Sequence, residues 1–181
     1  MKAFKIEDIN SPSYWDTHQT AVDFGLRQEK YAQLAGKGKR IVELGCGLSP
    51  FLSQVNFKEK WGIDYSPLTI QKAREMYPDI HYNIGDITNT ICADNHFDVV
   101  VCGEVIEHII DEPFRLLDEM ERICKKGGIM ILSTPHLEFQ DPEHLWEFDE
   151  EDFKIRGWET EEVFSERFPG RSYIFAWKRK K

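Results

Sequence analysis

The sequence predicts an α/β fold in which a doubly wound, mostly parallel sheet of seven strands ends in a C-terminal antiparallel hairpin. Short apolar runs alternate with longer segments of helical pattern through most of the 181 residues. Such alternation is typical of parallel strands joined by right-handed helical crossovers, with helices on both faces of the sheet. After residue 134 the pattern changes to two strand-like runs separated by Pro169-Gly170, which indicates a closing hairpin.

Five apolar runs are expected to form the parallel part of the sheet. The fourth and fifth are nearly continuous in apolar residues, as expected for strands covered on both faces. In chain order the five runs are RIVEL (40–44), KWGID (60–64), IHYN (80–83), FDVVVCG (97–103) and GIMILST (128–134). The two strands of the predicted hairpin are TEEVFSERF (160–168) and RSYIFAWK (171–178).

Helical segments lie between these strands. Ser66-Pro67 is an N-cap residue followed by proline at the first helical position, and it opens the predicted helix PLTIQKAREMY. Asp111 and Pro113 predict the start of another helix over 113–126, which Gly127-Gly128 would end.

We expect a single domain over residues 1–181, because a chain of this length is long enough for one well-buried core. Residues 1–38 form an N-terminal segment in which one or two helices are predicted, leading into a Gly/Lys turn. Residues 39–181 form the α/β core.

The composition limits the class of function. Hydrophobic residues make up 41% and charged residues 30% of the chain, which is ordinary for a soluble globular protein. The formal net charge of -9 argues against a protein that grips nucleic acid through a broad basic surface, although it leaves room for a local RNA contact. No apolar run approaches the roughly 20 residues of a membrane helix, and the N-terminal residues do not resemble a secretion signal. We therefore expect a cytoplasmic protein that does not bind membranes.

The four cysteines show no C-x-x-C pair and no spacing typical of zinc ligands or of a disulfide framework. Three of them lie in apolar surroundings, where cysteine behaves as a small buried hydrophobe. We expect reduced thiols in the core.

The stretch IVELGCGLSP (41–50) ends the first predicted strand with Gly-x-Gly. In a doubly wound sheet, ligands bind outside the carboxyl ends of the strands, near the point where the strand order reverses. Glycines there permit a tight turn and let a ligand approach the backbone. An ordinary strand-to-helix turn would explain Gly45 and Gly47 equally well on this motif alone.

Acids at the ends of the next two strands favour a ligand site. Asp64 ends the second strand, where a carboxylate can accept both hydroxyls of a ribose, and Asp86 follows the third strand beside the same crevice. A nicotinamide dehydrogenase is disfavoured because Pro50 occupies the position expected for a third glycine or alanine. Glu43 would repel a pyrophosphate, whereas it would attract a cofactor that carries positive charge.

These motifs together resemble the class I S-adenosylmethionine-dependent methyltransferases, over nearly the whole chain from about Tyr14 to the final strand. The resemblance extends to the ubiquinone-biosynthesis O-methyltransferases and implies a Rossmann-like sheet and S-adenosyl-L-methionine as cofactor. It is carried by VELGCG (42–47), GIDYSP (62–67), GDIT (85–88), FDVVVCGEVIEH (97–108) and CKKGGIMILSTP (124–135).

The resemblance implies roles for residues on the methionine side of the cofactor. The loop formed by Gly45, Cys46 and Gly47 would line the methionine portion. Glu43 would lie nearby, at the amino group or at a water molecule. The segment Gly103–Glu104 would pass near the methionine carboxylate and the sulfonium.

On the nucleoside side, the resemblance implies that Asp64 holds the ribose hydroxyls and that Tyr65 flanks the adenine. Asp86 would face the adenine amine, with the backbone of Ile87 beside the ring. Ser49 stands where many relatives have a third glycine, and serine usually serves at that position.

The segment EVIEH places Glu104, Glu107 and His108 at i, i+3 and i+4, so on a helical turn they would share one face. Such a set can hold a divalent cation such as Mg²⁺, Mn²⁺ or Zn²⁺, with His136 or His144 as a fourth ligand. The pattern resembles both the small-RNA 3′-end 2′-O-methyltransferases and the ubiquinone-biosynthesis enzymes. The alternatives are a helix start that lines the cleft, and a catalytic role for His108.

The resemblance thus predicts transfer of a methyl group to an oxygen or nitrogen atom of a small-molecule or macromolecular acceptor. For a hydroxyl acceptor, His108 is the first candidate for the general base and His144 the second. The alternatives are metal-dependent 2′-O-methylation of RNA and a non-catalytic cofactor-binding partner of another methyltransferase. These residues do not specify the acceptor or the oligomeric state.

Overall fold

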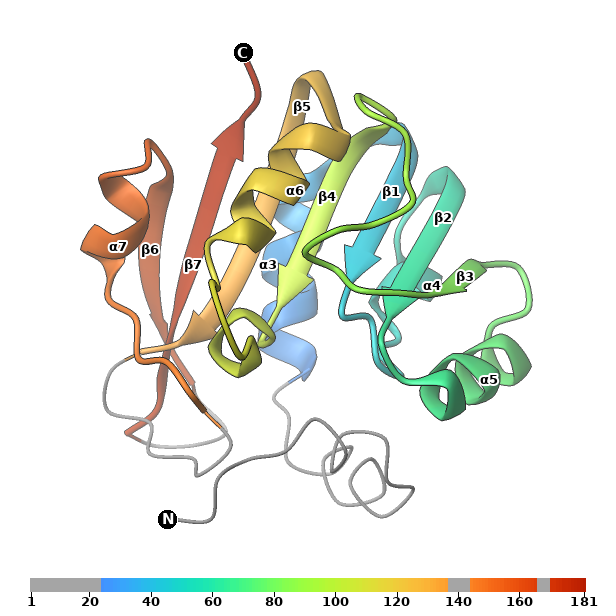
Figure 1. Ribbon diagram of the computed structural model, residues 1–181, viewed down its shortest axis with the longest axis horizontal. Coiled ribbons are helices and arrows are strands. Elements are labelled where there is room, and N and C mark those ends of the chain that lie inside the picture. Colours follow the sequence, from blue (N-terminus) through green and yellow to red (C-terminus); the bar gives the residue numbers. More distant parts are fainter. Residues whose placement is uncertain (1–23, 137–143, 166–169) are drawn as a thin grey trace.

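The computed structural model describes residues 24–136, 144–165 and 170–181, and within them the chain forms a seven-stranded sheet with the order β3-β2-β1-β4-β5-β7-β6. Strands β1 to β5 are parallel to one another, and β7 is antiparallel to both β5 and β6. The predicted fold class is therefore confirmed, including the antiparallel pair at the C-terminal edge (Figure 1).

Each of the seven predicted strands is present. Strand β1 is the middle strand of the parallel part. Residues 40–44 pair with β2 on one side, and residues 41–44 also pair with β4 on the other. The strands are β1 Gly38–Leu44, β2 Phe57–Asp64, β3 His81–Ile84, β4 Phe97–Gly103, β5 Cys124–Pro135, β6 Glu159–Phe164 and β7 Ser172–Arg179.

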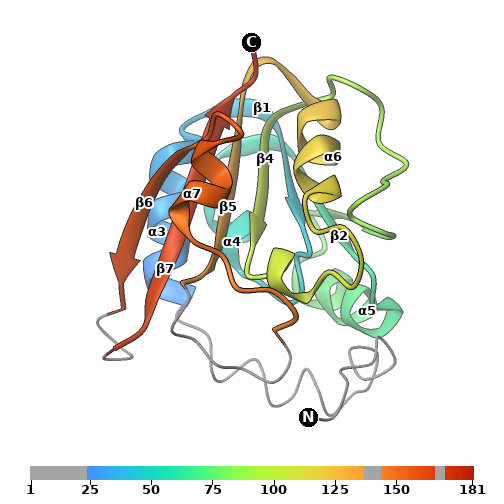
Figure 2. The same ribbon diagram turned by 60° about the vertical axis from the view of Figure 1, so that its left-hand side comes forward.

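Helices cover both faces of the sheet, as the doubly wound topology requires (Figures 1 and 2). One buried cluster joins α6 and the α7 region to one face, and the other joins α3, α4 and α5 to the opposite face. The helices are α3 Phe24–Ala35, α4 Phe51–Gln54, α5 Pro67–Met76, the 3₁₀ turn η1 Ile106–His108, α6 Arg115–Ile123 and α7 Glu150–Lys154. Among the described helices, none is long and apolar enough to span a membrane.

The start of α5 follows the local sequence signal. The side chain of Ser66 accepts a hydrogen bond of 3.2 Å from the backbone N–H of Thr69, and Pro67 occupies the first helical position. This cap satisfies one of the backbone donors that a helix leaves unpaired at its N-terminus. The predicted start is confirmed.

The predicted bounds of α6 are wrong at both ends. No side chain caps the helix, which begins at Arg115 rather than at Pro113. It ends at Ile123, because the next residues join β5 and Cys124 pairs with Phe97 of β4. Gly127 and Gly128 therefore lie within a strand, and pairing across the sheet overrides the helix-ending signal that two glycines give.

The described cysteines are all free thiols, and Cys46, Cys102 and Cys124 are buried as expected. Within the N-terminal segment, α3 confirms a helix before the Gly/Lys turn. Tyr14 lies outside the described residues.

Tyr31 anchors α3 to the sheet at the end of β4. Its ring packs against Phe51 and Phe175 at centroid distances of 5.5 and 5.7 Å, and its hydroxyl is 2.5 Å from Ser133 Oγ. A Cβ atom added to Gly103 would lie 1.9 Å from the Tyr31 hydroxyl oxygen. The absence of a side chain at Gly103 therefore makes room for the anchor.

We predict that Gly103→Ala destabilises the protein by about 1–3 kcal/mol, because the added Cβ would displace the buried Tyr31 hydroxyl from its hydrogen bond with Ser133. Urea unfolding measures this change. Gly25→Ala is the matched control: its Cβ would meet nothing within 4 Å, and alanine is the better helix former, so its stability should stay equal or rise. Equal effects of the two substitutions would contradict the anchoring role of Tyr31.

Candidate functional site

The candidate site lies at the carboxyl ends of β1, β2 and β4. The chain leaves β1 toward β2 on one side, whereas β4 continues to β5 on the other, so the strand order reverses between β1 and β4. Ligands of doubly wound sheets bind at such a switch point. The predicted cofactor residues are the last residues of strands or lie in the loops that come next, at the lower edge of the sheet in Figure 1.

The Gly-x-Gly turn after β1 is shaped by its own packing. Gly45 and Gly47 have φ values of 67° and 50°, in the left-handed region that favours glycine. The backbone N–H groups of Gly45 and Cys46 both donate to the carbonyl of Ile63, at 2.8 and 3.1 Å. A Cβ on Gly45 would lie 2.5 Å from a methyl group of Val105, so this glycine is required before any ligand is considered.

Asp64 connects the end of β2 to the same turn. One carboxylate oxygen accepts from Gly47 N and the other from Ser66 N, both at 2.9 Å. Burial raises the pKa of Asp64, and these backbone hydrogen bonds partly oppose the rise. Each oxygen keeps a further lone pair, so the prediction that Asp64 accepts ribose hydroxyls stays a prediction.

Glu43 is a buried acid with only part of its hydrogen-bonding capacity satisfied. Its side chain is 5% exposed, its Oε2 atom has no hydrogen-bond partner, and Ser49 hydrogen-bonds to the carboxyl group. Burial raises its pKa to about 8, against the lowering effects of Ser49 and of the nearby Arg27 charge. A buried carboxylate without full compensation is costly, so this oxygen is suited to a ligand that brings a donor or a positive charge.

Asp86 and Ile87 lie in the loop after β3, and Tyr65 directly follows β2. Both the backbone N–H and the hydroxyl of Thr88 donate to the same oxygen of Asp86, each at 2.8 Å, and the carboxylate is exposed. Ile87 packs into the core, which fixes the loop, and Tyr65 is 48% exposed. This arrangement leaves the second oxygen of Asp86 and the Tyr65 ring accessible beside the turn.

The structure contradicts the prediction that Glu104 shares a helical face with Glu107 and His108. Glu104 has a φ of 57°, so the chain turns there, and the 3₁₀ turn starts only at Ile106. Its carboxylate instead accepts a hydrogen bond of 2.5 Å from Ser133 Oγ.

Glu104 belongs to a network that the sequence analysis missed. Ser133 Oγ lies between the Glu104 carboxylate and the Tyr31 hydroxyl, at 2.5 Å from each, and Arg27 Nη1 is 3.7 Å from the same Glu104 oxygen. Burial raises the pKa of Tyr31, so its hydroxyl stays protonated. The only sequence signal was a serine at the end of a buried strand that is otherwise apolar. The network fixes the end of β4 against α3 and β5.

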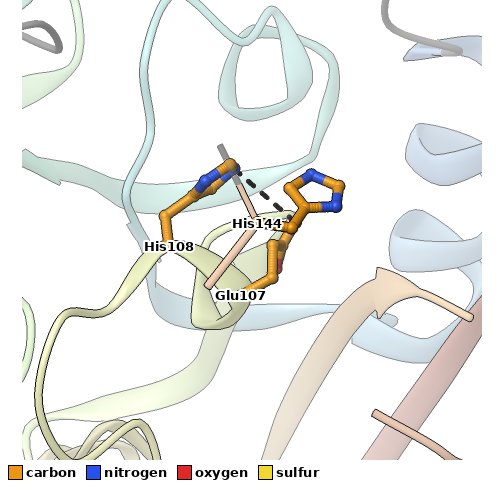
Figure 3. A group of neighbouring side chains, drawn as sticks. All are labelled: Glu107, His108 and His144. Carbon is orange, nitrogen blue, oxygen red and sulfur yellow. Dashed lines mark ion pairs between the residues drawn. The ribbon is translucent and has the colours of Figure 1, made fainter. Parts of the chain in front are cut away.

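Three side chains on this edge form a second group: Glu107, His108 and His144. One ligand atom from each lies within 4.8 Å of the others, and Figure 3 shows the three side chains converging. Glu107 is 1% exposed and its Oε1 atom has no hydrogen-bond partner, although His108 Nε2 lies 3.9 Å away. The two imidazole rings are 5.0 Å apart.

The surrounding backbone holds this group in place. Thr134 donates its hydroxyl to Glu107 Oε2 at 3.0 Å, and Leu145 N donates to the Glu107 carbonyl at 2.8 Å. His144, next in the chain, is thereby placed beside His108. His136 is not in the group, because its Nδ1 atom lies 2.9 Å from Glu162 Oε1 on β6. Of the two histidines predicted as further ligands, only His144 reaches the site.

The sequence of this chain is similar to those of known methyltransferases. Residues 42–132 match the family described as "Methyltransferase domain". A probable S-adenosylmethionine-dependent methyltransferase of Mycolicibacterium smegmatis is 28% identical over 136 residues, which are 72% of this chain and 49% of that protein. A ubiquinone biosynthesis O-methyltransferase of Coxiella burnetii is 30% identical over 115 residues, 60% of this chain and 48% of that protein. The chain therefore spans about half the length of these relatives.

A similar fold is found in solved structures. Phosphoethanolamine N-methyltransferase 2 of Haemonchus contortus, in complex with S-adenosyl-L-methionine, superposes with a TM-score of 0.74 at 16% identity, over 96% of this chain and 59% of that one. At this level of identity the likeness concerns the fold alone.

We predict that Glu43→Gln stabilises the ligand-free protein more at pH 8 than at pH 5. Between the ordinary carboxyl pKa of 4.5 and the value of about 8 in the fold, the unfolded chain loses a proton that the folded chain keeps. Stability therefore falls as the pH rises through this window, by at most about 1.4 kcal/mol per pH unit. Glutamine does not titrate, so its free energy of unfolding does not fall in this way. Urea unfolding should show that the stability of the variant relative to wild type is higher at pH 8 than at pH 5.

Glu59→Gln is the control, because this half-buried carboxylate is paired with Arg40 and its pKa is lowered. A stability difference for Glu43→Gln that is the same at pH 5 and pH 8 would show that Glu43 is ionised throughout.

Proposed function

Because this chain belongs to the methyltransferase-domain family, of the class I S-adenosylmethionine-dependent type, we propose that it transfers a methyl group from S-adenosyl-L-methionine to an oxygen or nitrogen atom of an acceptor. The relatives carry the cofactor assignment in their names, and the residues of this chain fit it. The acceptor and the activity of the whole protein are part of the proposal.

One observation carries the assignment of the site: the unpartnered buried oxygen of Glu43 beside the glycine turn. S-adenosyl-L-methionine bears an ammonium and a sulfonium group, either of which supplies the positive charge that this carboxylate lacks. A dinucleotide would instead bring phosphate charge to a buried acid. The buried acid therefore supports a cationic cofactor over a nicotinamide dinucleotide.

Other residues of the chain orient the nucleoside in this proposal. Asp64 at the end of β2 accepts ribose hydroxyls through its remaining lone pairs, and the free oxygen of Asp86 accepts from the adenine amine. The ring of Tyr65 would flank the adenine, and the Ile87 backbone would lie beside the ring. Gly103 and Glu104 border the methionine end, where Ser133 fixes the Glu104 carboxylate.

When bound, the cofactor would supply a methyl group activated by its sulfonium: the C–S bond would break as the acceptor atom bonds to that carbon, which leaves S-adenosylhomocysteine. The chain aligns the acceptor and takes up its proton. His108 is partly exposed at the same edge of the sheet and is the nearest candidate base for a hydroxyl acceptor, and His144, whose ring lies 5.0 Å from it, is the second.

We predict that binding of S-adenosyl-L-methionine releases a proton near pH 7. Glu43, with a pKa of about 8, is mostly protonated in the ligand-free protein, and a neighbouring cation favours its ionised form. Calorimetric titrations in two buffers of different ionisation enthalpy should therefore give different apparent heats. Glu43→Gln should abolish that difference and weaken binding at least tenfold, whereas Glu59→Gln should change neither.

Activity is tested with the methyl-labelled cofactor and a cell extract, separated into soluble and acid-precipitable products. Labelled product that depends on His108 supports a hydroxyl acceptor, and label that persists in His108→Ala and His144→Ala supports an amine. Cofactor binding without label in any fraction would favour the alternative of a non-catalytic partner. Competition by NAD as strong as that by S-adenosylhomocysteine would contradict the cofactor assignment.

A second candidate is metal-dependent methylation, including 2′-O-methylation of RNA. The observation that favours it is the unpartnered Glu107 oxygen facing two imidazoles within metal-ligand reach. A carboxylate and two histidines suit Zn²⁺ or Mn²⁺, and a bound cation would polarise an acceptor hydroxyl at this edge. The net charge of -9 weighs against a broad RNA surface.

For this candidate we predict one Zn²⁺ bound per chain after removal of metals with EDTA, as measured by calorimetry. His144→Ala should weaken binding at least tenfold, whereas His136→Ala, which removes a histidine paired with Glu162, should leave it within twofold. Equal affinity of wild type and His144→Ala would contradict the metal site and leave the two imidazoles as candidates for proton transfer alone.

A further inference from the structure

A hollow of about 440 Å³ lies at the amino ends of the parallel strands, on the opposite edge of the sheet from the glycine turn. Its walls come from the end of α3 and the turn that follows, from the starts of β4 and β5, and from the end of β7. In Figure 1 this is the upper edge, where the C-terminus lies. The hollow is thus separated from the cofactor site by the length of the strands.

The lining carries an excess of positive charge. The lining contains one carboxylate, that of Asp98, and four cationic side chains: Lys37, Lys125, Lys126 and Arg179. Lys125 pairs with Asp98 at 2.9 Å, which leaves three cationic side chains without an acidic partner among the residues that the structure describes. In a protein of net charge -9, three cations without an acidic side-chain partner around one hollow are a local reversal of the overall charge.

The remaining acceptors of Asp98 are also occupied. Its Oδ2 atom accepts from the backbone N–H groups of Lys39 and Arg40, at 2.9 and 2.7 Å. The carboxylate is therefore held by the start of β1 and by Lys125, and it does not neutralise the other cations of the lining.

The position of two of these cations argues for a ligand. Lys37 directly follows Gly36 after the end of α3, where a cation offsets the partial negative charge of the last helical carbonyls. Lys126 lies in β5 and Arg179 ends β7, so neither has such a structural role. Gly36 and Gly127 have positive φ, and a Cβ added to either would meet nothing within 4 Å, so there is space for a ligand beside the backbone. Their N–H groups already donate to the carbonyls of Ala32 and Lys180, so the cationic side chains would supply the attraction.

We propose that this basic hollow binds a small ligand that carries two or more negative charges, of the diphosphate type. Its volume falls within the usual range of small-molecule sites, about 300–1,000 Å³. Arginine and lysine are the side chains that bind phosphate oxygens, the former through two N–H groups. A nucleic-acid strand needs a basic surface that follows its backbone, and the acidic remainder of the chain opposes one.

The test is a titration of the full chain with inorganic pyrophosphate at constant ionic strength, followed through the backbone amide resonances in two-dimensional NMR. We expect saturable shifts at Gly36, Gly127 and Gly128. The double variant Lys126→Glu/Arg179→Glu should raise the dissociation constant at least tenfold. The control double variant Lys72→Glu/Lys154→Glu has the same change in charge on α5 and α7, away from the hollow, and should stay within twofold of wild type.

Thermal unfolding within a few degrees of wild type establishes that both double variants fold. Shifts that grow linearly without saturation, or equal losses in both double variants, would overturn the proposal in favour of nonspecific charge screening. A single-stranded RNA oligonucleotide that moves the same amides and binds more tightly than pyrophosphate would also overturn it, because the site would then be a nucleic-acid contact.

Discussion

The candidate site depends on the attachment of the glycine turn to the end of β2. The carbonyl of Ile63 accepts two backbone N–H groups of the turn, and the Asp64 carboxylate accepts a third. Val105, which follows β4, packs where a side chain on Gly45 would lie. The ends of three adjacent strands are thereby fixed to one another by contacts that need no ligand. The acids that follow those strands therefore converge on one place.

This rigidity explains how a poorly compensated acid persists in the interior. Glu43 is the penultimate residue of β1, and its neighbours in the sheet leave its side chain only 5% exposed. A bound cation would stabilise the ionised carboxylate, which burial destabilises. The same residue would therefore strengthen ligand binding and weaken the stability of the ligand-free protein. The Ser133 network differs in this respect, because its carboxylate is hydrogen-bonded without a ligand.

The sequence was sufficient where the signals are local. Apolar runs located the seven strands, and the Ser66-Pro67 pair located the start of α5. It failed at the end of α6, where pairing of Cys124 with Phe97 outweighs a glycine pair nearby in the chain. It also failed at Glu104, because helical spacing presumes helical φ values and this residue has a positive φ. The proximity of His144 to His108 depends on a hydrogen bond between Leu145 and Glu107, which no spacing rule contains.

The parallel topology has a consequence for the electrostatic field of the whole molecule. Because α3 and α6 run back toward the amino ends of the strands, the partial negative charges of their last carbonyls lie at that edge, and the basic side chains gathered there outweigh them. The buried acids Glu43, Asp64 and Glu107 lie at the other edge. Charged solutes of opposite sign are therefore drawn toward opposite ends of the sheet, and salt weakens both attractions. Two such solutes can diffuse to the same molecule without obstructing each other.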